Sequence, residues 1–132
     1  MNTQFLNPPS LCPTFGWTHV VVASGGKTVY VSGQVSVNER GEVVGKGDLM
    51  AQTKQTYENL KHALTAAGAR FDQVVKMNIY VVGLKPEHVP GLREIRGQYV
   101  SGQRPPASTL VGVEALVSAD WLIEIEVVAI FP

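Results

Sequence analysis

The chain has 132 residues, of which 45% are hydrophobic and 17% charged, and its eleven basic side chains equal its eleven acidic ones in number. This length suits one domain with a buried core, so we expect residues 1–132 to form a single domain. Zero net charge without a basic run argues against a dedicated nucleic-acid surface, because such a surface needs concentrated positive charge.

Residues 1–16 are rich in proline and are predicted to be irregular. They lack the basic stretch followed by an apolar stretch that marks a secretory signal, and no apolar run in the sequence approaches membrane-spanning length. Cys12 is the single cysteine, so it has no partner for an internal disulfide or for a cysteine metal site. We therefore expect a cytoplasmic protein that does not enter membranes.

Two runs rich in β-branched residues, 19–24 and 27–33, lie on either side of Gly25 and Gly26. Such runs across a two-glycine turn predict a β-hairpin. Residues 34–37 extend its second strand toward a turn at 38–41.

Asp48 begins the clearest helical pattern of the chain, which runs to Ala67. An aspartate suits the N-cap position, and Gly68 supplies the left-handed residue with which many helices end. One packed face follows from residues at three- and four-residue spacing: Leu49, Thr53, Thr56, Tyr57, Leu60, Ala63, Leu64 and Ala67.

The remaining residues add strands at 74–82, 109–113 and 121–131 and a shorter helix from about Pro90. The element order is ββαβαββ, which predicts an α+β fold with two helices packed on one face of a mixed β-sheet. The strands carry apolar residues on both faces, which favours a sheet that is buried on both sides. Because only two helices are available, we expect a partner subunit to cover the second face.

Several short segments occur in a specific order along the chain: Ser32-Gly33-Gln34, the first helix ending in AAGA, the strand VVKMNIYV, and the closing PPASTLVGV and LIEIEVVA. From about Gly16 to Phe131 this order resembles the RidA/YjgF family, also called the L-PSP endoribonuclease family. The resemblance implies a chorismate-mutase-like protomer and a homotrimer whose sheets pack inward as a barrel. Small-molecule ligands would then bind in three clefts between subunits.

Characterised members of this family hydrolyse enamines and imines, such as 2-aminoacrylate and its imine tautomer, to keto acids and ammonia. The resemblance implies that no metal and no cofactor take part. An arginine clamps the substrate carboxylate, and a glutamate orders the water that attacks the imine carbon. Positioning and electrostatics can supply this chemistry, since a bidentate arginine contact both orients and stabilises a carboxylate.

The resemblance places Glu124 at the glutamate that orders water and Trp17 at the aromatic residue of the cleft entrance. Ser32 and Gln34 come at the end of the strand that borders the cleft. On the sequence alone, Glu124 and Glu126 lie on one face of the last strand, where they either face water or line a pocket.

The cleft arginine of the family aligns with Ser108, directly before Thr109. A serine cannot neutralise a carboxylate, so the predicted substrate differs from 2-aminoacrylate. The hydroxyls of Ser108 and Thr109 either donate to a ligand carbonyl or satisfy backbone groups at the strand start. Arg93 and Arg96 project on one side of the second helix, where they are either solvated or supply a cation to the cleft. Arg104 precedes two prolines and is not assumed to replace the missing arginine.

Two other classes of function stay open beside an imine deaminase. A non-catalytic trimer could bind or sense a small molecule in the same clefts, and the serine in place of arginine favours this alternative. The second name of the family suggests cleavage of single-stranded RNA, which the neutral charge and the absence of a basic patch disfavour.

Overall fold

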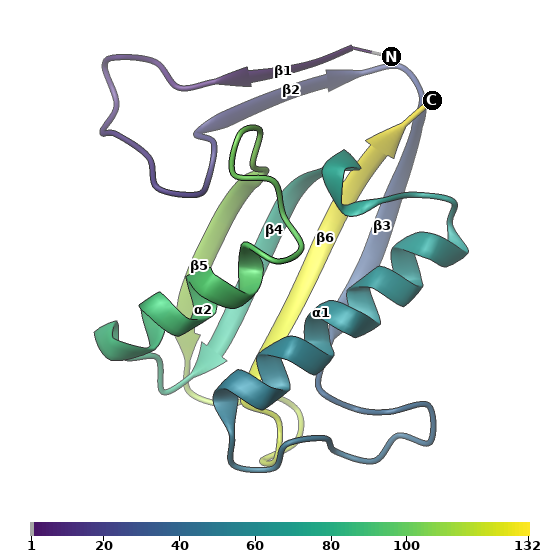
Figure 1. Ribbon diagram of the computed structural model, residues 1–132, viewed down its shortest axis with the longest axis vertical. Helices are drawn as coiled ribbons and strands as arrows, with labels where there is room; N and C mark the ends of the chain where they lie inside the picture. Colours follow the sequence, from purple (N-terminus) through teal and green to yellow (C-terminus); the bar gives the residue numbers. More distant parts are fainter. Residues whose placement is uncertain (1) are drawn as a thin grey trace.

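A computed structural model describes residues 2–132, and Figure 1 shows a sheet crossed on one face by two helices. Residue 1, part of the predicted irregular segment, lies outside the described residues. In chain order the elements are β1 (Asn2–Leu6), β2 (Val20–Ser24), β3 (Lys27–Gln34), α1 (Leu49–Ala66), η1 (Phe71–Gln73), β4 (Val74–Val82), η2 (Pro86–His88), α2 (Val89–Arg96), β5 (Ala107–Val113) and β6 (Ile123–Phe131).

The main sheet has four strands in the order β3-β6-β4-β5. β6 pairs antiparallel with β3 and β4, whereas β4 and β5 are parallel. Parallel neighbours need a long crossover, which α2 and its flanking loops supply. The chain therefore has the predicted α+β fold, with two helices on a mixed sheet.

The caps predicted for the first helix are confirmed. Oδ1 of Asp48 accepts a hydrogen bond from the backbone N–H of Ala51 at 3.0 Å. At the other end Gly68 has a φ of 78°, and the N–H of Ala69 donates to the carbonyl of Leu64 at 2.9 Å. This is a Schellman motif, which satisfies the last carbonyls of a helix.

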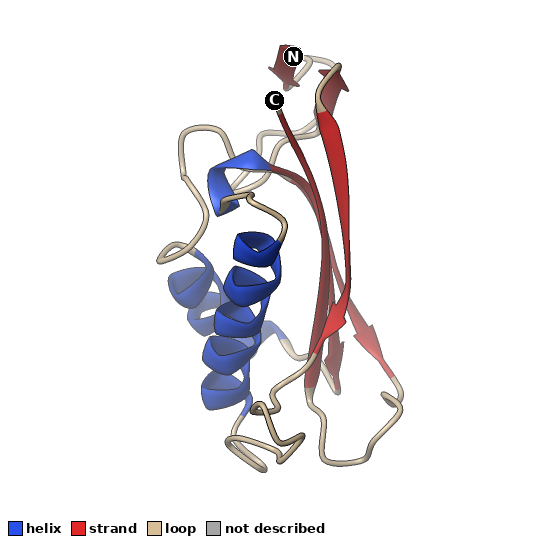
Figure 2. Cartoon of the chain, turned by 90° about the vertical axis from the view of Figure 1, so that its right-hand side faces the viewer, coloured by secondary structure: helices blue, strands red, loops and turns tan. Residues whose placement is uncertain are grey.

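The hydrophobic core lies between the helices and one face of the sheet. Figure 2 shows the helices on a single side of the strands, with the other face of the sheet uncovered in the single chain. Alternate residues of β6 face the core because side chains alternate along a strand. The fully buried residues include Tyr57, Leu60, Leu64, Met77, Val81, Ile123, Ile125 and Val127.

The predicted hairpin across Gly25 and Gly26 is wrong. β2 pairs antiparallel with β1, a strand that lies within the segment predicted to be irregular, and β3 pairs with β6 instead. Gly25 and Gly26 have φ values of 73° and 70°, so they do form a bend, but this bend joins two different sheets. A turn signal reports a local change of direction and does not select the partner of a strand.

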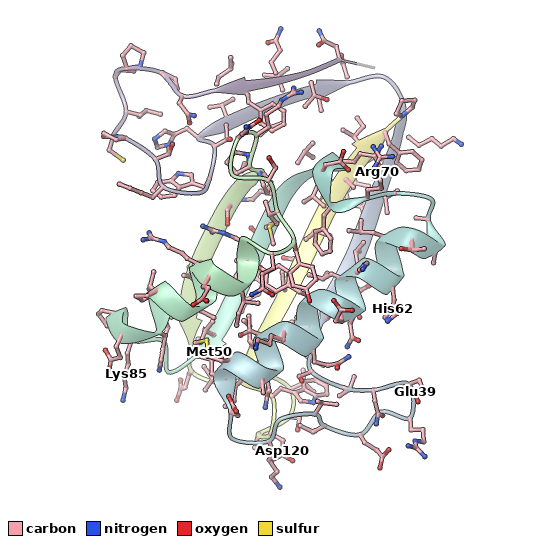
Figure 3. The ribbon with its side chains drawn as sticks, in the orientation of Figure 1. Glu39, Met50, His62, Arg70, Lys85 and Asp120 are labelled. Atoms are coloured by element: carbon pink, nitrogen blue, oxygen red, sulfur yellow. The ribbon has the colours of Figure 1, made fainter. Side chains whose placement is uncertain are left out.

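The second helix and the last strands differ from the prediction only at their ends. α2 begins at Val89 with Pro90 in its first turn, β5 begins at Ala107 rather than 109, and β6 begins at Ile123 rather than 121. Figure 3 shows Met50 where α1 approaches α2, and a Cβ at Gly91 would crowd its sulfur atom. No helix within residues 2–132 has the length and apolarity needed to cross a membrane.

Candidate functional site

A cavity of about 230 Å³ opens between α2, the helix-covered face of the sheet and the segment that leads into β2. Its lining residues come from these three parts and from α1. They are Phe15, Trp17, Thr53, Tyr57, Ile79, Val89, Leu92, Arg93, Arg96, Ser108, Leu110, Ile123 and Ile125. Concave, mostly apolar sites with a few polar groups are typical of small-molecule binding.

Three of the predicted binding residues line this cavity together. Trp17 comes from the N-terminal segment, Arg93 from α2 and Ser108 from β5. Ser108 faces the helices because it shares a strand face with Leu110, which packs against the core. The structure thus brings together residues that are far apart in the sequence.

Glu124 lies on the opposite face of the sheet. Its neighbours Ile123 and Ile125 point into the core, so the carboxylate between them points away from it. It lies against Gly33 of β3, since a Cβ at residue 33 would collide with Glu124 Oε2. The exposed Ser32 is next to this contact. Within the single chain the sheet therefore separates Glu124 from Ser108.

Thr109 and Gln34 do not line the cavity either. The Thr109 hydroxyl accepts a hydrogen bond from Lys76 Nζ at 2.9 Å on the outer face of the sheet. Gln34 Nε2 donates to the backbone carbonyl of Ser32 at 3.1 Å and borders a shallow depression beside α1.

The outer face carries a second polar group around Glu126. Oε1 of Glu126 accepts hydrogen bonds from the Tyr80 hydroxyl at 2.7 Å and from Asn78 Nδ2 at 3.1 Å. The bond from Tyr80, and then that from Asn78, hold the pKa of Glu126 below its usual range. Both donors belong to β4, the strand next to β6, so neighbouring residues of the sheet hold this carboxylate in place.

Arg96, for which the sequence left solvation or a place in the cleft open, lines the cavity, and so does Tyr57, which was predicted only to pack in the core. Burial lowers the pKa of the Arg96 guanidinium, the nearby Tyr57 opposes this shift, and Arg93 adds to it. Burial also raises the pKa of Tyr57 far above its ordinary value. The three-residue spacing of the two arginines was the available signal, and Tyr57 was indistinguishable from a core residue because it follows the apolar period of α1.

Arg104 has a structural partner elsewhere. Its guanidinium lies over the Phe5 ring at 4.5 Å from the centroid, and its Nη2 donates to the carbonyl of Thr3 at 3.3 Å. It therefore holds β1 and does not replace an arginine at Ser108. Among residues 2–132, no three histidine, cysteine, aspartate or glutamate side chains are grouped closely enough to hold a metal ion.

Comparison with known proteins gives a family match and relatives that are named as deaminases. A family described as Endoribonuclease L-PSP matches residues 10–131. The chain is 34% identical to a 3-aminoacrylate deaminase RutC of Acinetobacter baylyi, covering 92% of this chain and 90% of that protein. It is 32% identical to a 2-iminobutanoate/2-iminopropanoate deaminase of Dermatophagoides farinae, covering 69% of each.

A solved structure shares the whole architecture. A protein of unknown function of the conserved Rid family from Yersinia pestis superimposes with a TM-score of 0.93 at 39% identity, covering 99% of this chain and 100% of that one. Because the match covers 99% of this chain, it includes the N-terminal part, where β1 and β2 of this chain form a separate sheet. The chain belongs to the endoribonuclease L-PSP family, the RidA/YjgF family that the sequence resembled.

Proposed function

We propose that the protein hydrolyses a reactive imine, or the imine tautomer of an enamine, to a carbonyl compound and ammonia. The observation that carries this proposal is the cavity in which Trp17, Arg93 and Ser108 meet. Two relatives named as deaminases support it. Because the position before Thr109 is a serine, the substrate is expected to differ from 2-aminoacrylate.

The proposed active form is a homotrimer located in the cytoplasm. Glu124 and the cavity lie on opposite faces of the sheet, so one subunit cannot bring them to the same ligand. In a trimer whose uncovered sheet faces pack together, Glu124 and Ser32 of one subunit would complete the cavity of its neighbour. Each cleft between subunits would then hold one small-molecule ligand.

The chemistry needs only positioning and proton transfer. Glu124 orients a water molecule and accepts its proton as the oxygen bonds to the imine carbon. The electron pair of the carbon–nitrogen double bond moves to nitrogen, which takes up the proton that Glu124 accepted, so the carboxylate is regenerated. The resulting carbinolamine expels ammonia as the carbon–nitrogen bond breaks and the carbonyl forms. Water and imine thus give one carbonyl compound and one ammonia.

Release of ammonia from imines tests this proposal. An amino-acid oxidase generates 2-imino acids in situ, and their disappearance is followed with and without the protein. Glu124→Gln is expected to slow the catalysed reaction at least about 100-fold, because the amide cannot accept the proton of water. Glu114→Gln, a change at an exposed loop position, is the control with unaltered rate. Equal rates for wild type and Glu124→Gln would remove Glu124 from the mechanism.

A non-catalytic binding protein is the second candidate. The placement of Glu124 across the sheet from the cavity favours it, because no aspartate or glutamate of residues 2–132 lines the cavity of one chain to activate water. If no imine is hydrolysed faster with the protein than without it, while small ligands still bind in the cavity, this function replaces the deaminase.

A further inference from the structure

The cavity holds positive charge without a counter-charge. Arg93 and Arg96 both line it, and neither forms an ion pair with any residue between 2 and 132. Arg93 is exposed, whereas Arg96 is partly buried. A guanidinium keeps its charge even when partly buried, and an unpaired buried charge is costly. An anionic ligand would remove that cost at Arg96.

Gly16 fixes the position of the Arg96 head. A Cβ at residue 16 would collide with Nη2 of Arg96, so the guanidinium lies directly against the backbone of this glycine. Gly16 has a φ of 76°, a conformation that favours glycine. The Arg96 side chain therefore reaches from α2 to the segment that carries Phe15 and Trp17. Because this contact already restricts the side chain, less of its conformational freedom is lost when a ligand binds.

Two hydroxyl groups of the same cavity also lack partners. Tyr57 is 1% exposed, and its hydroxyl forms no hydrogen bond with the described part of the chain. Ser108 likewise forms none through its side chain there. Both residues line the cavity, so their hydroxyls can donate a hydrogen bond to a ligand there. Together with the N–H groups of the Arg96 guanidinium, these hydroxyls can donate hydrogen bonds to the two oxygens of a carboxylate.

The cavity as a whole is larger than a small imino acid needs. An apolar cavity of about 150 Å³ is enough to hold benzene. The 230 Å³ present here leaves room for an aromatic ring and a carboxylate together. Trp17, Leu110 and Ile123 form walls against which a flat ring can pack.

We propose that Arg96, with the hydroxyls of Tyr57 and Ser108, binds the carboxylate of an aromatic substrate. The site takes a carboxylic acid whose reactive carbon carries an aromatic or similarly bulky apolar group. The claim that such a substrate is hydrolysed rests on the proposed function. The substrates are then the imines of aromatic 2-amino acids. Its binding part stands without turnover.

Calorimetric titration with unreactive probes tests the binding part. Phenylacetate is expected to bind at least tenfold more tightly than its neutral amide phenylacetamide, which lacks the charge, and than acetate, which lacks the ring. Arg96→Met should weaken phenylacetate binding at least tenfold and leave phenylacetamide binding unchanged. Arg40→Met removes an equal charge from an exposed turn and serves as the control with unaltered affinity.

A glycine pair gives a second test that leaves the arginine in place. Gly16 and Gly41 have the same φ of 76°, but a Cβ at residue 41 meets nothing within 4 Å. Gly16→Ala should displace the Arg96 head and weaken phenylacetate binding several-fold, whereas Gly41→Ala introduces the same backbone strain without this effect. Circular dichroism of each variant checks that it is folded.

The outcomes separate this inference from the proposed function. Equal affinity for phenylacetate and phenylacetamide, or unchanged phenylacetate affinity in Arg96→Met, overturns the inference. Imine hydrolysis whose KM for the phenylalanine-derived imine is unaltered by Arg96→Met overturns it too, and the deaminase stands. Phenylacetate binding through Arg96 without release of ammonia from any imine supports the carboxylate site and removes the deaminase.

Discussion

Gln52 of α1 is fully buried, and backbone groups of two loops satisfy both ends of its amide. Its Nε2 donates to the carbonyls of Gly45 at 3.2 Å and Asp120 at 3.0 Å, and its Oε1 accepts from the N–H of Leu122 at 2.9 Å. Such a satisfied amide serves the fold, since leaving its partners unpaired would cost about 1–3 kcal/mol. Tyr57 of the same helix lines the cavity, and its hydroxyl has no such partner among residues 2–132, so a ligand can supply one.

Glu126 gives a pH-dependent prediction at the residue scale. Hydrogen bonds from Tyr80 and Asn78 lower the pKa of Glu126, so its contribution to stability is present above the unfolded pKa and is lost as the pH falls. Tyr80→Phe should therefore reduce the free energy of unfolding by about 0.5 kcal/mol at pH 7 and by less at pH 3. Urea unfolding at both pH values measures the two differences.

The control for this prediction is the same change in a Glu126→Gln background. The glutamine does not titrate, so Tyr80→Phe should then have equal effects at both pH values. A wild-type difference that does not shrink between pH 7 and pH 3 would show that the Tyr80 hydrogen bond does not depend on the charge of Glu126.

At the scale of elements, the β1–β2 ribbon depends on contacts with the loop that precedes β5. A two-stranded ribbon is marginally stable by itself. The N–H of Thr18 donates to the carbonyl of Pro106 at 3.1 Å, and its hydroxyl donates to that of Pro105. Arg104 stacks on Phe5 of β1. These contacts fix the ribbon at one end of the sheet, and with it the segment that walls the cavity.

The end of α1 gives a stability prediction. Gly68 has a φ of 78° in the Schellman motif, and a Cβ there would meet nothing within 4 Å, so the cost of a side chain is purely one of backbone conformation. Gly68→Ala should destabilise the protein by about 1 kcal/mol, measured by urea unfolding. Gly102→Ala is the matched control in open space without a positive φ, and an equal loss there would contradict this explanation.

At the scale of the whole molecule, the uncovered face of the main sheet exposes apolar surface. Figure 2 shows this face opposite the helices, and its Tyr30 is 80% exposed in the single chain, with Val111 at 38%. These two apolar side chains lie on the edge strands β3 and β5, and a chain packed against this face would bury them. This supports the proposed homotrimer, in which each subunit would cover the sheet of another.

The mass of the particle in solution checks the proposed trimer. Light scattering should give three times the 14.3 kDa of one chain. Tyr30→Glu should shift the mass toward a single chain and abolish imine hydrolysis, because a carboxylate buried against an apolar partner is costly. Val117→Glu changes a loop residue that is 92% exposed and should leave the mass unaltered. A folded wild type with the mass of one chain would refute the trimer.

The sequence predicted those elements whose signals are local. The caps of α1 at Asp48 and Gly68 are backbone preferences of single residues, and the alternation along β6 identified Glu124 and Glu126 as sharing a face. The order of the predicted elements indicated the α+β fold, and the order of short segments indicated the family. Periodicity sufficed here because burial selects apolar residues at the spacing of each element.

Only the tertiary structure decided which strand pairs with β2, where Arg104 lies, and which of the two cavity arginines lies against the backbone of Gly16. The run at β2 has no preference between β1 and β3, since backbone hydrogen bonding is the same with either partner. Arg93 and Arg96 are equivalent in sequence, and the backbone of Gly16 makes them different in space. The separation of Glu124 from Ser108 by the sheet could not be read from the chain either, because it depends on the pairing of three strands that are distant in sequence.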